Sequence, residues 1–131
     1  MTDGYGVAWL ALCAAFAIHG ADEALTDFLS VYNPAVRAIR ARFPFLPIPT
    51  FTFRVWLTVL VVAVVALVSL TPLAFRGAPG LRPVAYVFGI VMAGNGLLHL
   101  GGSVYRRKLM PGTYSAPLIL AAAIYLLAVA R

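Results

Sequence analysis

The residues of this 131-residue chain that could do chemistry are two histidines and a cluster of acids, all set within apolar stretches. One stretch contains four ionisable residues: His19, Asp22, Glu23 and Asp27. Another contains His99, four residues after Asn95. The chain has only four Asp and Glu residues in total, so three of them share one short segment. Ionisable groups at membrane depth are costly unless they face a protein interior and find partners, which marks this cluster as the leading candidate for a functional site.

Helical spacing would gather these side chains on two faces. His19, Glu23 and Asp27 follow an i, i+4, i+8 line along one helix, and Asp22 lies beside them. On the other segment, the amide and the second imidazole share a face because they are four residues apart. One helix therefore offers an imidazole and up to three carboxylates, and the other offers an imidazole and an amide.

Three interpretations of the cluster stay open. It can be a buried network in which each polar group satisfies another, a metal site, or a metal-free acid–base centre. As a metal site it would draw on five candidate ligands: His19, Asp22, Glu23, Asp27 and His99. Imidazole and carboxylate donors suit zinc or iron. As a metal-free centre, Glu23 and His99 would be catalytic and exchange a proton with a substrate, while Asn95 steadies the developing charge.

The surrounding sequence predicts an all-α protein with a single membrane-embedded domain, residues 1–131. Hydrophobic residues make up 63% of the chain and charged residues 11%, whereas soluble domains carry about 25% charged residues. Four apolar runs approach the roughly 20 residues that a membrane-spanning helix needs. The four predicted transmembrane helices are residues 5–30, 52–75, 83–103 and 115–130. Between the first two, Val36, Ile39 and Phe43 recur at helical spacing opposite arginines, which predicts a short interfacial helix over residues 34–43.

The basic residues predict the orientation of this four-helix bundle. Ten Lys and Arg against four Asp and Glu give a net charge of +6. One side of the predicted spans holds most of them: Arg37, Arg40, Arg42, Arg54, Arg106, Arg107 and Lys108. The other side holds both termini and the rest: Arg76, Arg82 and Arg131. The positive-inside rule places the first group in the cytoplasm and both termini outside. Because these arginines lie in short loops between apolar spans, nucleic-acid binding is a poor interpretation.

The two histidines are expected at the same depth. The helical rise places His19 about 21 Å along its span and His99 about 24 Å along its own. Both imidazoles then lie in the cytoplasmic half of the membrane, where a common pocket requires the first and third spans to be neighbours. Next to His99, at the cytoplasmic edge, Tyr105, Arg106 and Arg107 could hold a phosphate or carboxylate headgroup, although anchoring by the positive-inside rule also explains the arginines.

At these residues the chain resembles the HXXEE family of small bacterial membrane proteins. The segment His19-Gly-Ala-Asp22-Glu23 is similar to the family's signature, with Asp22 in place of the first glutamate. A second signature, N-x-x-x-H followed by a P-G-x-x-[ST]-A turn, is matched by Asn95 to His99 and by Pro111-Gly112-Thr113-Tyr114-Ser115-Ala116. The segment Arg42-Phe43-Pro44 fits the usual F-P element. The resemblance implies a multi-span helical membrane protein in which these His, acidic and Asn positions belong together, and it implies no particular reaction.

These features together predict a metal-dependent enzyme, a hydrolase or an oxidoreductase, that acts on a lipid-like or hydrophobic substrate within the membrane. The expected location is the bacterial cytoplasmic membrane, since the Arg-rich, Lys-poor and Ala-rich composition is typical of a GC-rich bacterial genome. The expected partners are membrane lipids and a hydrophobic small molecule. A metal-free isomerase-like enzyme is one alternative. Another is a non-enzymatic binder or carrier of a metal ion or hydrophobic molecule, which at 131 residues would call for a homo-oligomer.

Overall fold

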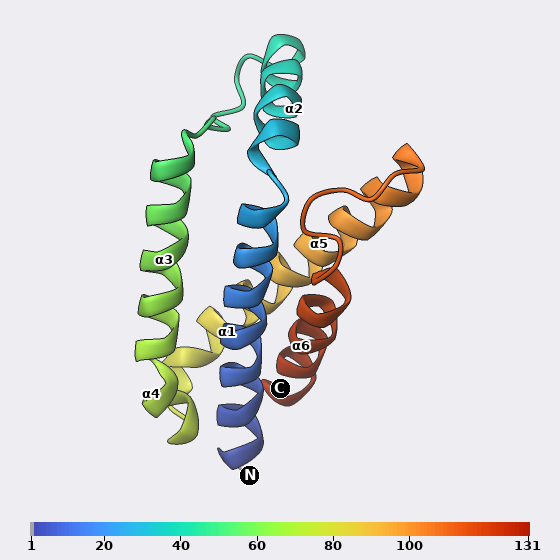
Figure 1. Cartoon of the computed structure of the whole chain (residues 1–131). Coiled ribbons are helices and arrows are strands. Elements are labelled where there is room, and N and C mark those ends of the chain that lie inside the picture. Colours follow the sequence, from blue (N-terminus) through green and yellow to red (C-terminus); the bar gives the residue numbers. More distant parts are fainter. Residues whose placement is uncertain (1) are drawn as a thin grey trace.

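The computed structural model describes residues 2–131, and every regular element in that range is helical. In chain order these elements are α1 (Thr2–Leu25), α2 (Leu29–Arg42), α3 (Phe53–Ser69), α4 (Thr71–Phe75), the 3₁₀ helix η1 (Pro79–Leu81), α5 (Arg82–Arg106) and α6 (Ala116–Val129). Figure 1 shows α1 through the middle of the molecule, with both termini at the same end. The prediction of an all-α fold is confirmed.

Three segments are long and apolar enough to cross a membrane: Gly4–Leu25, Phe53–Phe75 and Pro79–Arg106. They coincide with the first three predicted spans. The fourth apolar helix, α6, has only 14 residues, fewer than the roughly 20 that a full crossing requires. The prediction of four spanning helices therefore holds for three of them. The turn before it extends to Ser115, so α6 begins at Ala116, one residue after the predicted start.

The first predicted span is interrupted near its end. Asp27 has a left-handed backbone conformation with φ 56°, which Asp tolerates better than most residues. Just before it, the Thr26 hydroxyl donates to the Asp22 carbonyl at 2.6 Å, and the Phe28 N–H donates to the Glu23 carbonyl at 3.0 Å. The chain turns here and enters α2 five residues before the predicted interfacial helix, so Pro34 lies inside a helix and not at its boundary.

Packing concentrates on α1, α5 and α6. Helix α6 packs against both α1 and α5, and α4 packs against the first half of α1. The buried core is centred on Trp9, whose ring meets Phe88 edge-on at 5.6 Å and whose Nε1–H donates to the Leu67 carbonyl at 3.1 Å. These contacts fix the position of α1 along its own axis relative to α3 and α5. They thereby fix the level at which the polar residues of α1 lie.

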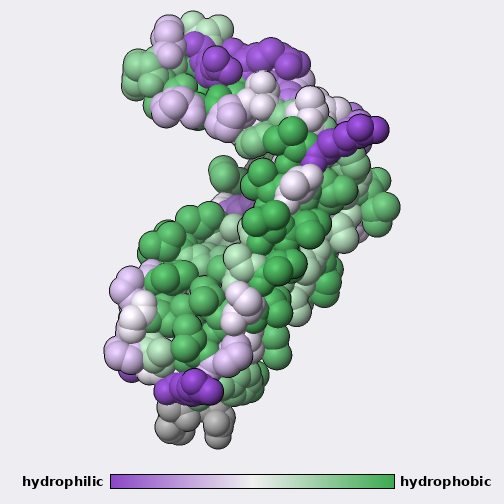
Figure 2. All heavy atoms as spheres, turned by 90° about the vertical axis from the view of Figure 1, so that its left-hand side faces the viewer, coloured by the Kyte–Doolittle hydropathy of each residue, from purple (hydrophilic) through white to green (hydrophobic). Residues whose placement is uncertain are grey.

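The loop after α2 folds back along that helix. The Asn33 side chain accepts the Phe51 N–H at 3.0 Å and donates to the Phe51 carbonyl at 2.8 Å, while the Tyr32 hydroxyl donates to the Pro49 carbonyl at 2.9 Å. Figure 2 shows hydrophilic residues gathered at the two ends of the molecule, with an apolar band between them. That distribution agrees with a protein whose middle lies in a membrane.

Candidate functional site

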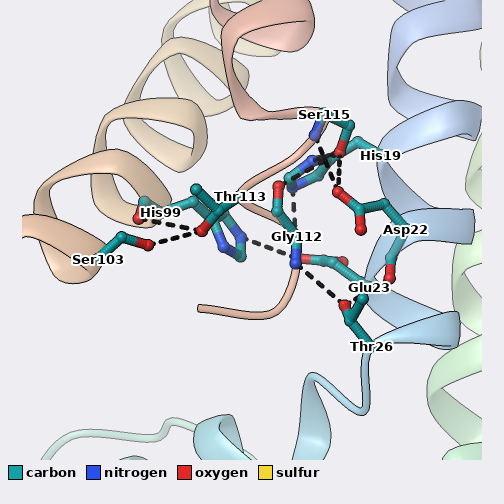
Figure 3. A network of polar contacts seen from close by, with 9 residues as sticks. All are labelled: His19, Asp22, Glu23, Thr26, His99, Ser103, Gly112, Thr113 and Ser115. Carbon is teal, nitrogen blue, oxygen red and sulfur yellow. Dashed lines mark hydrogen bonds and ion pairs between the residues drawn. The ribbon is translucent and has the colours of Figure 1, made fainter. Parts of the chain in front are cut away.

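Helices α1 and α5 bring three ionisable side chains into one buried group (Figure 3): His19, Glu23 and His99. One donor atom from each of the three lies within 4.8 Å of the others. The two imidazole rings meet edge-on, with centroids 4.8 Å apart and planes at 80°. The prediction that the first and third spans are neighbours, with their imidazoles turned toward each other, is confirmed by this contact.

The Glu23 carboxylate is the shared partner of the two imidazoles. Its Oε1 atom lies 3.0 Å from His99 Nε2 and 3.4 Å from His19 Nε2. The shorter distance is that of an ordinary N–H···O hydrogen bond, whereas the longer one is outside the usual range for such a bond. His99 therefore donates to the carboxylate through Nε2, and the His19 nitrogen faces the same oxygen without a bond of that quality.

Asp22 is connected to this group through hydrogen bonds with Ser115. Its Oδ2 atom accepts the backbone N–H of Ser115 at 2.9 Å and the hydroxyl at 2.6 Å. The same hydroxyl oxygen lies 2.8 Å from His19 Nδ1. A hydroxyl has one proton, and Ser115 donates it to the Asp22 carboxylate in the short charge-assisted hydrogen bond. We therefore assign a proton to His19 Nδ1, which donates it to the Ser115 oxygen.

This assignment determines what the other nitrogen of His19 can do. In the neutral imidazole, Nε2 then carries a lone pair, and within residues 2–131 that buried atom has no hydrogen-bond partner. It faces the Glu23 carboxylate at 3.4 Å. Two acceptors face each other unfavourably unless a cation lies between them, so the site suits either a proton on His19 Nε2 or a bound metal ion.

The turn before α6 closes the third side of the site. Gly112 has φ +83°, and a Cβ atom there would lie 2.7 Å from His99 Cε1 and 3.0 Å from Glu23 Cγ. The Gly112 N–H donates to the Thr26 hydroxyl at 3.2 Å, which ties the turn to α1. On the α5 side, the Ser103 and Thr113 hydroxyls are 2.7 Å apart. Glycine is therefore required at this position both by its backbone and by the space that the two site residues occupy.

The remaining residues of the predicted site lie apart from this group. Asp27 is exposed, because the left-handed turn carries it off the helix face that it was expected to share, so the structure does not bring this predicted ligand to the group. Asn95 is half-buried and lines a cleft beside His99. Three residues lie exposed at the end of α5, outside the site: Tyr105, Arg106 and Arg107.

Helical spacing and residue type assign no role to three residues that the structure places at the site: Thr26, Gly112 and Ser115. The last two belong to the P-G-x-x-[ST]-A segment, which entered only as part of a resemblance. A polar residue in a turn that leads into an apolar helix was the available signal. Its role could not be worked out without the packing of α6 against α1, which brings Ser115 to Asp22 across 93 positions of the chain.

The fold and the site define a helical protein with three membrane-length helices and a buried His–Glu–His group. The chain belongs to the family described as "Protein of unknown function with HXXEE motif", which it matches over residues 9–126. No curated protein and no solved structure matches the chain.

Proposed function

We propose that this protein is a membrane-embedded metalloenzyme whose ion is held by His19, Glu23 and His99. The observation that carries this proposal is the buried Nε2 atom of His19, which has no partner within residues 2–131 and faces the Glu23 carboxylate at 3.4 Å. Tetrahedral ligands on bonds of about 2.0–2.1 Å lie about 3.4 Å from one another. The distance from His19 Nε2 to the Glu23 carboxylate, 3.4 Å, matches that spacing. The distance from His99 Nε2, 3.0 Å, is shorter because a hydrogen bond takes the place that an ion would occupy.

The donor set is of the catalytic kind. Two imidazoles and one carboxylate leave a fourth position open, as in catalytic zinc sites, and they also suit iron. When bound, the ion would activate water or dioxygen toward a substrate. The bond from His19 to Ser115, backed by Asp22, is the outer support that fixes the tautomer of a metal-binding histidine. Aspartate suits this outer position, since its carboxylate reaches Ser115 and not the centre of the group.

The proposed location is the bacterial cytoplasmic membrane. The three membrane-length helices and the apolar band of Figure 2 support it. Figure 1 places α2 and the end of α5 away from the termini, so most of the basic residues lie at one end of the molecule. Under the positive-inside rule that end faces the cytoplasm, the termini face outward, and the site lies in the cytoplasmic half.

A metal-free acid–base enzyme is the second candidate, because one observation favours it. The hydrogen bond between His99 Nε2 and Glu23 Oε1, at 3.0 Å, is already complete without an ion. In that case the three side chains share a proton, with His19 held as the imidazolium, and Glu23 and His99 pass the proton to and from a substrate.

Metal analysis of the full chain, expressed in metal-replete medium and purified in mild detergent, separates the two candidates. We expect about one equivalent of zinc or iron per chain, and less than about a tenth of an equivalent in Glu23→Gln. Asp27→Asn is the matched control, since it makes the same acid-to-amide change four residues further along and should keep the metal. A helical, monodisperse wild-type protein with less than about a tenth of an equivalent of any transition metal would reject the metal centre in favour of acid–base catalysis.

A further inference from the structure

An apolar cleft of about 270 Å³ lies directly beside the site. The residues around it that matter here come from the start of α2 and the middle of α5: Phe28, Val31, Tyr32, Ala35, Asn95 and His99. The Phe28 ring lies 5.6 Å from the His99 ring and 5.4 Å from the Tyr32 ring, so one wall of the cleft is aromatic. The cleft therefore joins an apolar binding surface to a residue of the proposed centre.

The lining of the cleft contains three polar side chains: Tyr32, Asn95 and His99. The Tyr32 hydroxyl is occupied by the Pro49 carbonyl. Asn95 contributes an amide that can both donate and accept a hydrogen bond. His99 is buried, its Nε2 is bonded to Glu23, and its Nδ1 has no hydrogen-bond partner among the described residues. His99 Nδ1 is enclosed and lies beside the Gly112 turn. The Asn95 amide is therefore the group of the lining that can bind an oxygen atom of a ligand.

The charge of the lining limits what the cleft can accept. None of the described residues that line it is Asp, Glu, Lys or Arg. A carboxylate or phosphate transferred into such a surface would lose its hydration without gaining a counter-charge from a carboxylate, ammonium or guanidinium side chain of the lining, which is unfavourable. Arg106 and Arg107 do not supply one, because they lie exposed at the end of α5 and outside this lining.

The opening of the cleft indicates how a ligand enters. Leu98 lines the cleft and is 74% exposed, so the cleft reaches the apolar outer surface of α5. Under the proposed membrane location that surface faces lipid chains. The volume is slightly below the roughly 300–1,000 Å³ of sites that enclose a whole small molecule. One end of a longer molecule fits inside, with the remainder among the lipids.

From these observations we infer the substrate class of the proposed enzyme: an uncharged lipid with a hydroxyl or carbonyl group at the end that enters the cleft between α2 and α5. The inference rests on the proposed function, since it takes the group beside the cleft to be the reacting centre. Asn95 binds the ligand oxygen next to His99, and the aromatic wall packs against the apolar chain that follows it.

Photolabelling of the detergent-purified full chain tests this inference. The probe is a long-chain alcohol with a diazirine in its chain, and the labelled peptides are identified by mass spectrometry. We expect labelling within residues 28–35 and 95–99, and competition by hexadecanol about fivefold or more stronger than by hexadecane or hexadecyl phosphate. Asn95→Leu should remove the advantage of hexadecanol over hexadecane, because it keeps an apolar side chain and deletes the amide.

A matched pair of variants checks that the labelled surface is the cleft. Ala35→Phe fills the cleft from an exposed position of α2 and should lower labelling about fivefold or more. Ala38→Phe makes the same change at another exposed position of α2, outside the cleft lining, and should leave labelling unchanged. Equal effects of the two variants, labelling confined to other peptides, or equal competition by hexadecyl phosphate would overturn the inference.

Metal content measured in the same samples separates this inference from the proposed function. Ala35→Phe should keep the wild-type metal content while it loses the label. Cleft-specific labelling by the alcohol in a metal-free protein would reject the metal centre and retain the substrate class. Bound metal together with labelling that ignores the cleft would retain the metal centre and reject the substrate class.

Discussion

Helices α1 and α3 lie beside each other, yet they differ in opposite directions in hydrophobicity and in burial. The segment Phe53–Phe75, which contains α3, is the more hydrophobic of the two, and none of the fully described residues of α3 is buried. Helix α1 carries His19, Asp22 and Glu23 near its C-terminal end and many small residues, and half of its membrane-length stretch is buried. In a water-soluble protein the more hydrophobic helix would be expected inside.

The proposed membrane location explains this inversion. An apolar side chain gains little by leaving lipid for the protein interior, whereas a polar side chain gains partners there. Helix α3 can therefore face lipid along most of its surface, and α1 turns its polar residues toward α5 and α6. Where the two helices touch, the Leu60 side chain of α3 occupies the space beside Gly20, where a Cβ atom would collide with it. Small residues of α1 thus serve the contact with α3, and its polar residues serve the site.

The largest difference in stability is expected when one apolar side chain is truncated in each of the two helices. Leu12 of α1 is fully buried, so Leu12→Ala leaves a cavity and should lower the free energy of unfolding by about 3 kcal/mol. Val62 of α3 is 61% exposed, and Val62→Ala should cost about 0.5 kcal/mol or less. Unfolding titrations in mixed micelles, followed by circular dichroism, measure both. Similar losses in the two variants would show that α3 is buried in the working protein, for example against a second copy of the chain.

The main features of the site could be predicted from the sequence because they follow from local rules. Helical spacing places His19 and Glu23 on one face, and the helical rise puts His99 at the same depth. Hydropathy then located three membrane-length helices. These inferences need only the geometry of single helices and the rule that buried polar groups seek each other.

The remaining features depend on how elements meet. The left-handed conformation of Asp27 breaks the expected span and removes that residue from the site. The partnership between Asp22 and Ser115 joins two segments that no periodicity connects. Because neither the break nor the partnership leaves a repeating pattern, the sequence could not reveal that one predicted ligand is exposed and that another acts through a serine.

A substitution at Ser115 should weaken the proposed metal site without disturbing the packing of the helices. Ser115→Ala removes the hydroxyl that fixes the tautomer of His19, and it should weaken metal binding about 10–100-fold with little change in helix content. Chelator competition titrations measure this affinity. Ser103→Ala is the control, because that hydroxyl contacts Thr113 and the Met110 N–H and not His19. Ser115→Thr should restore most of the affinity. Unchanged affinity in Ser115→Ala would leave the serine with a purely structural role.

A further test, which separates the two regions of the molecule, uses two glycines that share a left-handed backbone. Gly77 follows α4, at the α3 side of the molecule, with φ 65°, and Gly112 lies at the site with φ +83°. Alanine at Gly77 should cost about 1 kcal/mol of stability, because an L-residue is strained in that conformation. Gly112→Ala should cost more, because its Cβ atom also collides with His99. Only Gly112→Ala places a Cβ atom against His99 and Glu23, so only this variant should also lose bound metal. Thermal melts together with metal analysis measure the two effects separately. Full metal content in Gly112→Ala would show that the turn can move away from the two side chains, and that it does not hold them in place.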